Sequence, residues 1–172
     1  MSRRLFFALW PDDNVRQQLT QIKNKAGQCH QGKTMQPANL HLTLVFLGNV
    51  NQQQYDCIVD QAEQITFSPF DLCLGHIAAF QKAKVLWLGL QERPDALMLL
   101  AESLHQQAAD CGIQLDNKPF NPHVTLMRKV SRLHKMEIEP VSWSVDHFCL
   151  VESHTYPEGV QYKVIKTWQE TP

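Results

Sequence analysis

Residues 37–44 read PANLHLTL and residues 119–126 read PFNPHVTL, so one short motif occurs twice in this chain. Five of the eight positions are identical, and the copies are offset by 82 residues, close to half of the 172-residue chain. The similarity extends backwards, because LFFALW at residues 5–10 and VLWLGL at residues 85–90 are each followed by a Pro-Asp pair and a helical pattern. Such a repeat predicts two similar lobes, each made of a strand, a helix and a motif strand. A pseudo-twofold axis between the lobes would bring the two motifs face to face.

Three stretches of the chain show the periodicity of amphipathic helices. The first starts at Asp12 or Asp13, either of which can cap it, and Gly27 is expected to end it. The second spans residues 51–65, and the third follows Pro94, which suits the first turn of a helix. Each stretch has apolar residues at intervals of three or four, so each is expected to pack on a sheet.

The remaining apolar runs predict strands. Residues 40–47 and 123–130 are rich in aliphatic and β-branched side chains, and we expect them to form the two motif strands. Further strands are expected at residues 5–10, 70–80, 84–90, 141–151 and 160–168. Because no strict strand-helix-strand rhythm appears, the pattern favours the α+β class. We predict one bilobal domain over residues 1–172, with two mainly antiparallel sheets flanked by helices around a central cleft.

Composition restricts the classes of protein and partner that fit this chain. Hydrophobic residues make up 44% and charged residues 19%, which excludes a disordered, collagen-like or coiled-coil chain. The net charge of −1 gives no general field for polyanions, so any contact with nucleic acid must be local. The longest fully apolar run, Leu5–Trp10, is too short for a membrane span or a signal sequence. The five cysteines show no metal-knuckle spacing or disulfide framework, and we expect small buried side chains in a reducing cytosol.

The repeated motif carries side chains suited to acid-base catalysis. His and Thr two positions apart on a strand point to the same side, about 6.5–7 Å apart along it. His41 and Thr43 therefore share one face, and His123 and Thr125 share the corresponding face in the other lobe. With one imidazole neutral and one protonated, the pair can deprotonate water and protonate a leaving oxygen, while the hydroxyls donate to phosphate. The alternative, an incidental structural histidine on each strand, is disfavoured because burying unpartnered His and Thr is costly.

At these residues the sequence resembles the two-histidine phosphoesterases, specifically the bacterial RNA 2',3'-cyclic phosphodiesterases first named 2'-5' RNA ligases. Beyond the two motifs, the matching residues are RLFFA at 4–8, FLG at 46–48, VLWLG at 85–89, Arg128, Tyr162 and Trp168. The resemblance implies a bilobal fold with a V-shaped cleft and metal-independent hydrolysis of RNA 2',3'-cyclic phosphates to 2'-phosphomonoesters. By the family pattern, His41 is the proton donor and His123 is the proton acceptor.

The expected partner is an RNA that ends in a 2',3'-cyclic phosphate, such as a tRNA fragment. No cofactor, metal or membrane is expected, because no Asp or Glu lies within six residues of His41 or His123 and no HExxH motif is present. We expect a monomer in the cytoplasm. Because the cyclic ester is strained, the same residues are compatible with weak, reversible 2'-5' ligation of RNA. Two alternatives stay open: a phosphodiesterase acting on small cyclic nucleotides, and a non-catalytic nucleotide-binding module.

Arg128 and Phe46 each lie five residues after their motif histidine, so they occupy matching positions in the repeat. Strict alternation would point each side chain to the face opposite its histidine, into the lobe. Because a buried unpaired arginine is very unfavourable, we infer that the strand bends or bulges after the motif and returns Arg128 to the cleft. There its guanidinium would bind phosphate or stack on a base. Phe46 is interpreted either as a second stacking surface or as a core aromatic.

Two other features have ordinary explanations. Residues 27–34 (GQCHQGKT) match the P-loop pattern GxxxxGK[ST], but a helix precedes them and a strand follows, whereas a P-loop joins a strand to a helix. We therefore expect a polar connection there and no nucleoside triphosphate site. A run of basic residues beside the second motif is typical of a solvated loop and also suits an RNA backbone. It consists of Arg128, Lys129, Arg132 and Lys135.

Overall fold

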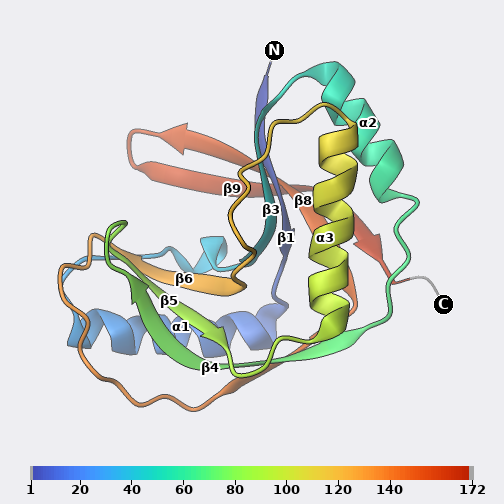
Figure 1. Cartoon of the computed structure of the whole chain (residues 1–172). Coiled ribbons are helices and arrows are strands. Elements are labelled where there is room, and N and C mark those ends of the chain that lie inside the picture. The colour runs from blue at the N-terminus through green and yellow to red at the C-terminus, as the bar shows by residue number, and fades with distance from the viewer. Residues whose placement is uncertain (1, 171–172) are drawn as a thin grey trace.

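Helices and strands are interleaved along the chain, which a computed structural model describes from residue 2 to residue 170 (Figure 1). The helices within that range are α1 (Asp13–Cys29), the 3-10 helix η1 (Pro37–Asn39), α2 (Gln52–Ala62) and α3 (Asp95–Asp110). The strands are β1 (Arg3–Leu9), β2 (Lys33–Thr34), β3 (Leu42–Val50), β4 (Phe70–Phe80), β5 (Val85–Leu90), β6 (His123–Arg128), β7 (Val141–Val145), β8 (His147–Tyr156) and β9 (Gly159–Gln169). No helix between residues 2 and 170 combines the length and the hydropathy that crossing a membrane requires.

The strands form two antiparallel halves joined at one point. The first lobe contains β3, β1, β8 and β9, and the second lobe contains β7, β4, β5 and β6, with β2 added beside β6. The only residue pair that connects β3 to β6 is Leu42 opposite Val124. The α+β, antiparallel and bilobal prediction is confirmed. Instead of two separate sheets, the structure has one sheet that is continuous through that single pair. The junction between the lobes therefore lies at the two motifs.

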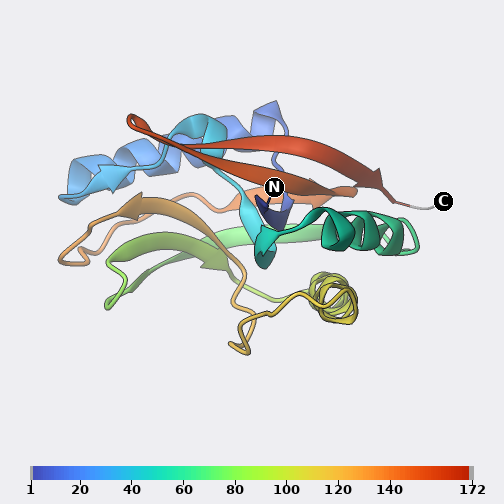
Figure 2. The same cartoon turned by 90° about the horizontal axis from the view of Figure 1, so that it is seen from above.

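The helices of the repeat are exchanged between the lobes. Helix α1 follows β1 of the first lobe but packs mainly on β6, β2 and β7, next to the second lobe. Helix α3 follows β5 of the second lobe but packs on β3, with α2 beside it (Figures 1 and 2). Each lobe therefore completes its core with a helix that follows a strand of the other.

The helix boundaries and buried faces follow from local sequence. The Asp12 carboxylate accepts a hydrogen bond from the Val15 backbone N–H at 2.8 Å and caps α1. Asn51 and Gln54 form a reciprocal capping box at the start of α2. The predicted apolar face of α3 is buried, as are the predicted apolar residues of α1. The helical periodicity was thus sufficient to identify the packed faces.

Several predicted boundaries differ from the structure. The helix expected at 51–65 ends at Ala62, and the motif strands expected at 40–47 and 123–130 are Leu42–Val50 and His123–Arg128. Two larger differences concern the first helix and the strand expected at 141–151. Helix α1 continues through Gly27 to Cys29, because the glycine is needed for close packing and not for a turn: a Cβ there would lie 2.8 Å from Thr34 Cγ2. Residues 141–151 are not one strand, since the chain breaks at Asp146 into β7 and β8. These two strands lie in different lobes, so the break carries the chain from one lobe to the other.

The cysteine prediction also needs correction. Cys57 of α2 and Cys111 at the end of α3 form a disulfide, and Cys29 is exposed. Only Cys149 is a buried free thiol among residues 2–170. The disulfide partners are 54 residues apart in sequence, and only the packing of α2 against α3 brings them together.

Candidate active site

The two motifs meet at the junction between the lobes. Leu42 and Val124, which pair there, are fully buried in the core. His41 and Thr43 flank Leu42, while His123 and Thr125 flank Val124, and all four are half-buried. Because neighbours along a strand point to opposite faces, these four side chains lie on the face away from the core. The structure therefore brings together the four residues predicted from the repeat.

Each motif imidazole is oriented by the residue two positions before it. The His41 Nδ1–H donates to the Asn39 carbonyl oxygen at 2.7 Å, and the His123 Nδ1–H donates to the Asn121 carbonyl oxygen at 2.7 Å. A carbonyl can only accept, so the proton sits on Nδ1 and each Nε2 carries the free lone pair. The Nε2 of His41 also lies 2.9 Å from Thr43 Oγ1, which donates to it. Both rings thus present Nε2 for proton transfer.

Aromatic side chains fix the position of His41. Trp10 stacks on its ring at 5.6 Å between centroids, while Phe6 and Tyr162 pack against it at 4.9 and 5.1 Å. Phe6 and Tyr162 also belong to a small apolar cluster on this face of the first lobe. This cluster offers an apolar surface next to the imidazole, on which a base or ribose could pack.

His123 has a corresponding aromatic wall built from different positions. The centroid of the His123 ring lies 5.1 Å from that of Phe80 and 5.7 Å from that of Trp87. The residue paired with His123 on β5 is Gly89, where an added Cβ would lie 2.5 Å from a Trp87 ring atom. Glycine at this position therefore lets the Trp87 indole lie beside His123.

Burial and neighbouring cations disfavour the protonated forms of both imidazoles. Burial lowers the pKa of His41 to about 4, the hydrogen bond to the Asn39 carbonyl opposes this, and His123, Arg16 and Arg128 lower it further. Burial, followed by the Arg128 charge, lowers the pKa of His123, with the bond to the Asn121 carbonyl again opposing. These effects favour the neutral form of both rings in the free protein. A bound phosphate anion would offset these effects and favour the imidazolium.

Arg16 of α1 holds the segment that precedes His41. Its guanidinium donates to the carbonyl oxygens of Pro37 at 2.6 Å and Leu40 at 3.0 Å. Its Cζ atom also lies 5.2 Å from the centroid of the Trp10 ring. The Trp10 indole therefore contacts both the Arg16 guanidinium and the His41 imidazole. Sequence reasoning missed Arg16, Trp10 and Phe80. Nothing in the local pattern distinguishes them from ordinary helix and strand residues, because their role depends on contacts between elements.

The predicted bulge is present in both motif strands. On β6, Thr125 pairs with Trp87 and Met127 with Leu86, which leaves Leu126 as an extra residue. Met127 and Leu126 are both buried, and Arg128 returns to the face of His123 and is exposed. The inferred bulge after the second motif is confirmed, and it puts Arg128 on the face that carries His123.

Phe46 occupies the matching position on β3. There Thr43 pairs with Ala8 and Val45 with Phe7, so Leu44 is the extra residue. Phe46 pairs with Phe6, which contacts His41, and its side chain is 51% exposed with the Arg4 guanidinium 5.0 Å from its ring. The exposure excludes a core role for Phe46 and leaves an aromatic surface on the His41 face.

Neither the P-loop pattern nor a metal cluster forms a second site. Residues 27–29 end α1 and residues 33–34 form β2, so the order is helix then strand, as predicted. Within residues 2–170, no group of three or more His, Cys, Asp and Glu side chains is arranged to hold a metal ion. Independence of metals remains a prediction, because only an activity measurement can test it.

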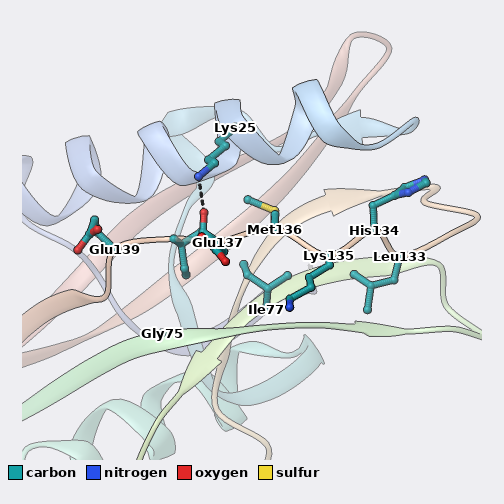
Figure 3. A pocket seen from close by; sticks show the side chains of 10 residues that line it. Lys25, Gly75, Ile77, Leu133, His134, Lys135, Met136, Glu137 and Glu139 are labelled. Atoms are coloured by element: carbon teal, nitrogen blue, oxygen red, sulfur yellow. Dashed lines mark hydrogen bonds between the residues drawn. The ribbon is translucent and has the colours of Figure 1, made fainter.

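A hollow of about 780 Å³ lies away from the motifs, between α1 and residues 133–139 (Figure 3). Ile77 lines it from β4, whereas the adjacent Ala78 pairs with Trp87 of the His123 wall. The hollow is therefore on the opposite face of this sheet. Lys25 donates to the Glu137 carbonyl oxygen across its rim. We assign no chemistry to it.

Comparison with known proteins agrees with this geometry. A family model described as the 2'-5' RNA ligase superfamily matches residues 11–157. An RNA 2',3'-cyclic phosphodiesterase of Escherichia coli is 32% identical, with 98% of this chain and 97% of the relative covered. One from Archaeoglobus fulgidus is 29% identical, with coverage of 96% and 99%. The crystal structure of E. coli LigT complexed with 3'-AMP superposes with a TM-score of 0.91 at 32% identity, covering all of both chains. TT0787 of Thermus thermophilus gives 0.80 at 26% identity, covering 96% and 97%.

Proposed function

The chain belongs to the 2'-5' RNA ligase superfamily, and from that membership we propose that it hydrolyses RNA 2',3'-cyclic phosphate ends to 2'-phosphomonoesters. The observation that supports this most directly is the meeting of His41, Thr43, His123 and Thr125 around one residue pair, with the proton of each imidazole held on Nδ1 so that Nε2 can accept one. Relatives that cover nearly the whole chain are RNA 2',3'-cyclic phosphodiesterases, which agrees with such a site.

The proposed reaction transfers two protons in one displacement. The Nε2 of His123 accepts a proton from water as the water oxygen attacks phosphorus in line with the 3' oxygen. The P–O3' bond breaks, and the protonated Nε2 of His41 gives its proton to the departing 3' oxygen. The products are a 2'-phosphomonoester and a 3'-hydroxyl, and solvent then restores both imidazoles.

The threonines and the cleft side chains hold the phosphate during this step. The Thr43 hydroxyl, which bonds to His41 in the free protein, and the Thr125 hydroxyl would donate to the non-bridging oxygens. Arg128 would neutralise part of the phosphate charge, and Phe46 would stack on a base. Positioning of this kind supplies most of the catalysis in phosphoryl transfer.

The same site is compatible with weak 2'-5' ligation. If the 5'-hydroxyl of a second RNA replaces water, its attack breaks the same P–O3' bond and forms a 2'-5' linkage. The reaction is reversible because the strained cyclic ester stores the energy of the linkage. This ligation therefore requires no ATP.

All four motif side chains come from one chain, so one copy carries a complete site and we propose a monomer. We also propose that the enzyme acts in the cytoplasm, on an RNA such as a tRNA fragment.

The proposed activity should survive removal of divalent metal. We expect RNA ending in a 2',3'-cyclic phosphate to be converted to the 2'-phosphomonoester in the presence of EDTA, because the two imidazoles supply the acid and the base. Chromatography of the digested terminal nucleotide separates the 2'- and 3'-phosphate products. Complete loss of activity in EDTA, with recovery on adding Mg²⁺ or Mn²⁺, would contradict the mechanism. Formation of the 3'-phosphate would contradict the direction of ring opening.

Replacing Arg128 by alanine should reduce turnover without unfolding the protein. Arg128 is exposed and has no ion pair among the described residues, so its loss should leave the melting temperature nearly unchanged. A lost charge-assisted contact to phosphate should lower kcat/KM by about 10- to 100-fold. Arg132→Ala, in the same basic run, is the matched control. A fall in melting temperature with unchanged kinetics would make Arg128 a structural residue.

A further inference from the structure

Lys33 lies on the same face of the second lobe as the catalytic groups. It pairs directly with Arg128 in the short ladder between β2 and β6. Side chains of directly opposed residues in an antiparallel pair share one face, and the bulge at Leu126 has put Arg128 on the His123 face. Thr34 points the other way, with its methyl group packed at Gly27 of α1. Lys33 therefore points to the face that carries His123, next to Arg128.

The backbone at Gly32 is built for this approach. Its φ of +151° is in the region that favours glycine, and an added Cβ would lie 2.7 Å from the Arg128 carbonyl oxygen. Only glycine thus allows β2 to come close enough to pair with β6. Gly32 and Lys33 match the Gly-Lys pair of the P-loop pattern, but here they place a lysine beside Arg128.

The ammonium group of Lys33 reaches the first lobe. It lies 3.9 Å from the position that a Cβ would take at Gly159, in the turn between β8 and β9. This hairpin extends over η1 and β2 (Figures 1 and 2), and the Asn39 side chain holds it by donating to the Val160 carbonyl oxygen at 2.8 Å. Lys33 consequently lies between Arg128 of the second lobe and the β8–β9 turn of the first lobe.

Cations outnumber acidic side chains at this end of the site, where Glu158 is the acidic residue of the turn between β8 and β9. Lys33, Arg128 and Lys129 are exposed, and no ion pair within residues 2–170 includes them. Lys84 adds a further exposed cation on the neighbouring turn, where its carbonyl oxygen accepts from the Val130 N–H at 3.0 Å. On a protein of net charge −1, such a local row of cations suits a second phosphate beside the reacting one.

We propose that Lys33 binds the phosphodiester that joins the terminal nucleotide to its 5' neighbour, while Arg128 binds the terminal cyclic phosphate. The inference rests on the proposed function and narrows its substrate class. An RNA end of two or more nucleotides fills both positions, whereas a mononucleoside cyclic phosphate has no group for Lys33. The enzyme should then prefer RNA ends to small cyclic nucleotides.

Two substrates separate the two phosphate positions. Adenosine 2',3'-cyclic phosphate contains only the reacting phosphate, and the dinucleotide ApA ending in a 2',3'-cyclic phosphate adds one linkage. Lys33→Ala should lower kcat/KM for the dinucleotide by about 3- to 10-fold and change the value for the mononucleotide by less than about twofold. The slope of log kcat/KM against log salt for the dinucleotide should become shallower by about 0.7. Lys33→Arg should retain the dinucleotide rate. Lys163→Ala removes an exposed lysine of β9 that points away from the cleft, and it is the control.

Equal losses on both substrates would mean that Lys33 binds the reacting phosphate, and no loss on either would mean that it binds no phosphate; each result overturns the inference. Failure of the proposed function is a different result, in which wild-type protein hydrolyses neither substrate. Binding of a labelled ApA 2'-phosphate, measured by fluorescence anisotropy, still tests Lys33 in that case. Lys33→Ala should weaken this binding, and unchanged affinity would overturn the inference.

Discussion

Replacing either His41 or His123 by alanine is expected to lower the rate of cyclic phosphate hydrolysis by at least about 10²-fold. Each ring contributes one Nε2 for proton transfer, and alanine removes that nitrogen. The double variant should lose less than the product of the single losses, because the two groups act on one displacement. Single-turnover rates on an RNA 2',3'-cyclic phosphate give these factors directly.

A substrate with a better leaving group than the 3' oxygen separates the roles of the two rings. A p-nitrophenyl phosphodiester needs little protonation of its leaving oxygen, so it should restore much of the rate of His41→Ala but not that of His123→Ala. Restored activity of the His123 variant alone would exchange the donor and acceptor assignments. If neither variant is restored, the rings bind phosphate without transferring protons, and the acid-base mechanism is wrong.

Controls for these variants follow from the packing around each ring. His41 is enclosed by Phe6, Trp10 and Tyr162, so alanine leaves a gap there. His41→Gln fills more of that space and can still donate to the Asn39 carbonyl, but it cannot carry a proton. It should therefore fold like the wild type and remain inactive. His105→Ala, on α3, should leave the rate unchanged.

The motif residues could be predicted from the sequence because their arrangement depends on local periodicity. A repeat of His-x-Thr fixes which side chains share a face of a strand, whatever the rest of the chain does. The bulge before Arg128 was also predictable, since an unpaired arginine does not remain in a core. Phe46, at the matching position, carried no such signal, because an aromatic side chain is stable on either face.

Other features depend on contacts that a local pattern does not contain. The exchange of α1 and α3 between the lobes follows from which sheet face each helix meets, and the amphipathic spacing is the same for either lobe. The pairing of Lys33 with Arg128 joins segments that are 95 residues apart, so the sequence around either residue does not predict the contact. The Cys57–Cys111 disulfide likewise depends on α2 packing against α3. These are properties of the assembled core.

The second large effect is expected in the dependence of kcat/KM on pH. The reactive form has His41 protonated and His123 neutral, and in the free protein the pKa of His41 is lowered to about 4 while that of His123 is also lowered. Raising the pH removes the proton from His41, and lowering it protonates His123. The profile should therefore be bell-shaped with its maximum below pH 6.5. Above that pH, kcat/KM should fall about tenfold per unit, or about 100-fold between pH 6.5 and 8.5.

The profile of kcat should extend to higher pH than that of kcat/KM. A bound cyclic phosphate places a negative charge beside His41, which opposes the effects of burial and of the Arg16 and Arg128 cations and raises the pKa of the ring in the complex. Replacing Arg128 by alanine removes one of these cations, so the alkaline limb of kcat/KM should also move to higher pH. NMR titration of the His41 ring with and without sulfate measures the same shift in the absence of turnover. Coincident alkaline limbs for kcat and kcat/KM, together with a His41 titration that sulfate does not move, would show that substrate charge does not supply the acid. Proton donation would then have to come from a group other than His41.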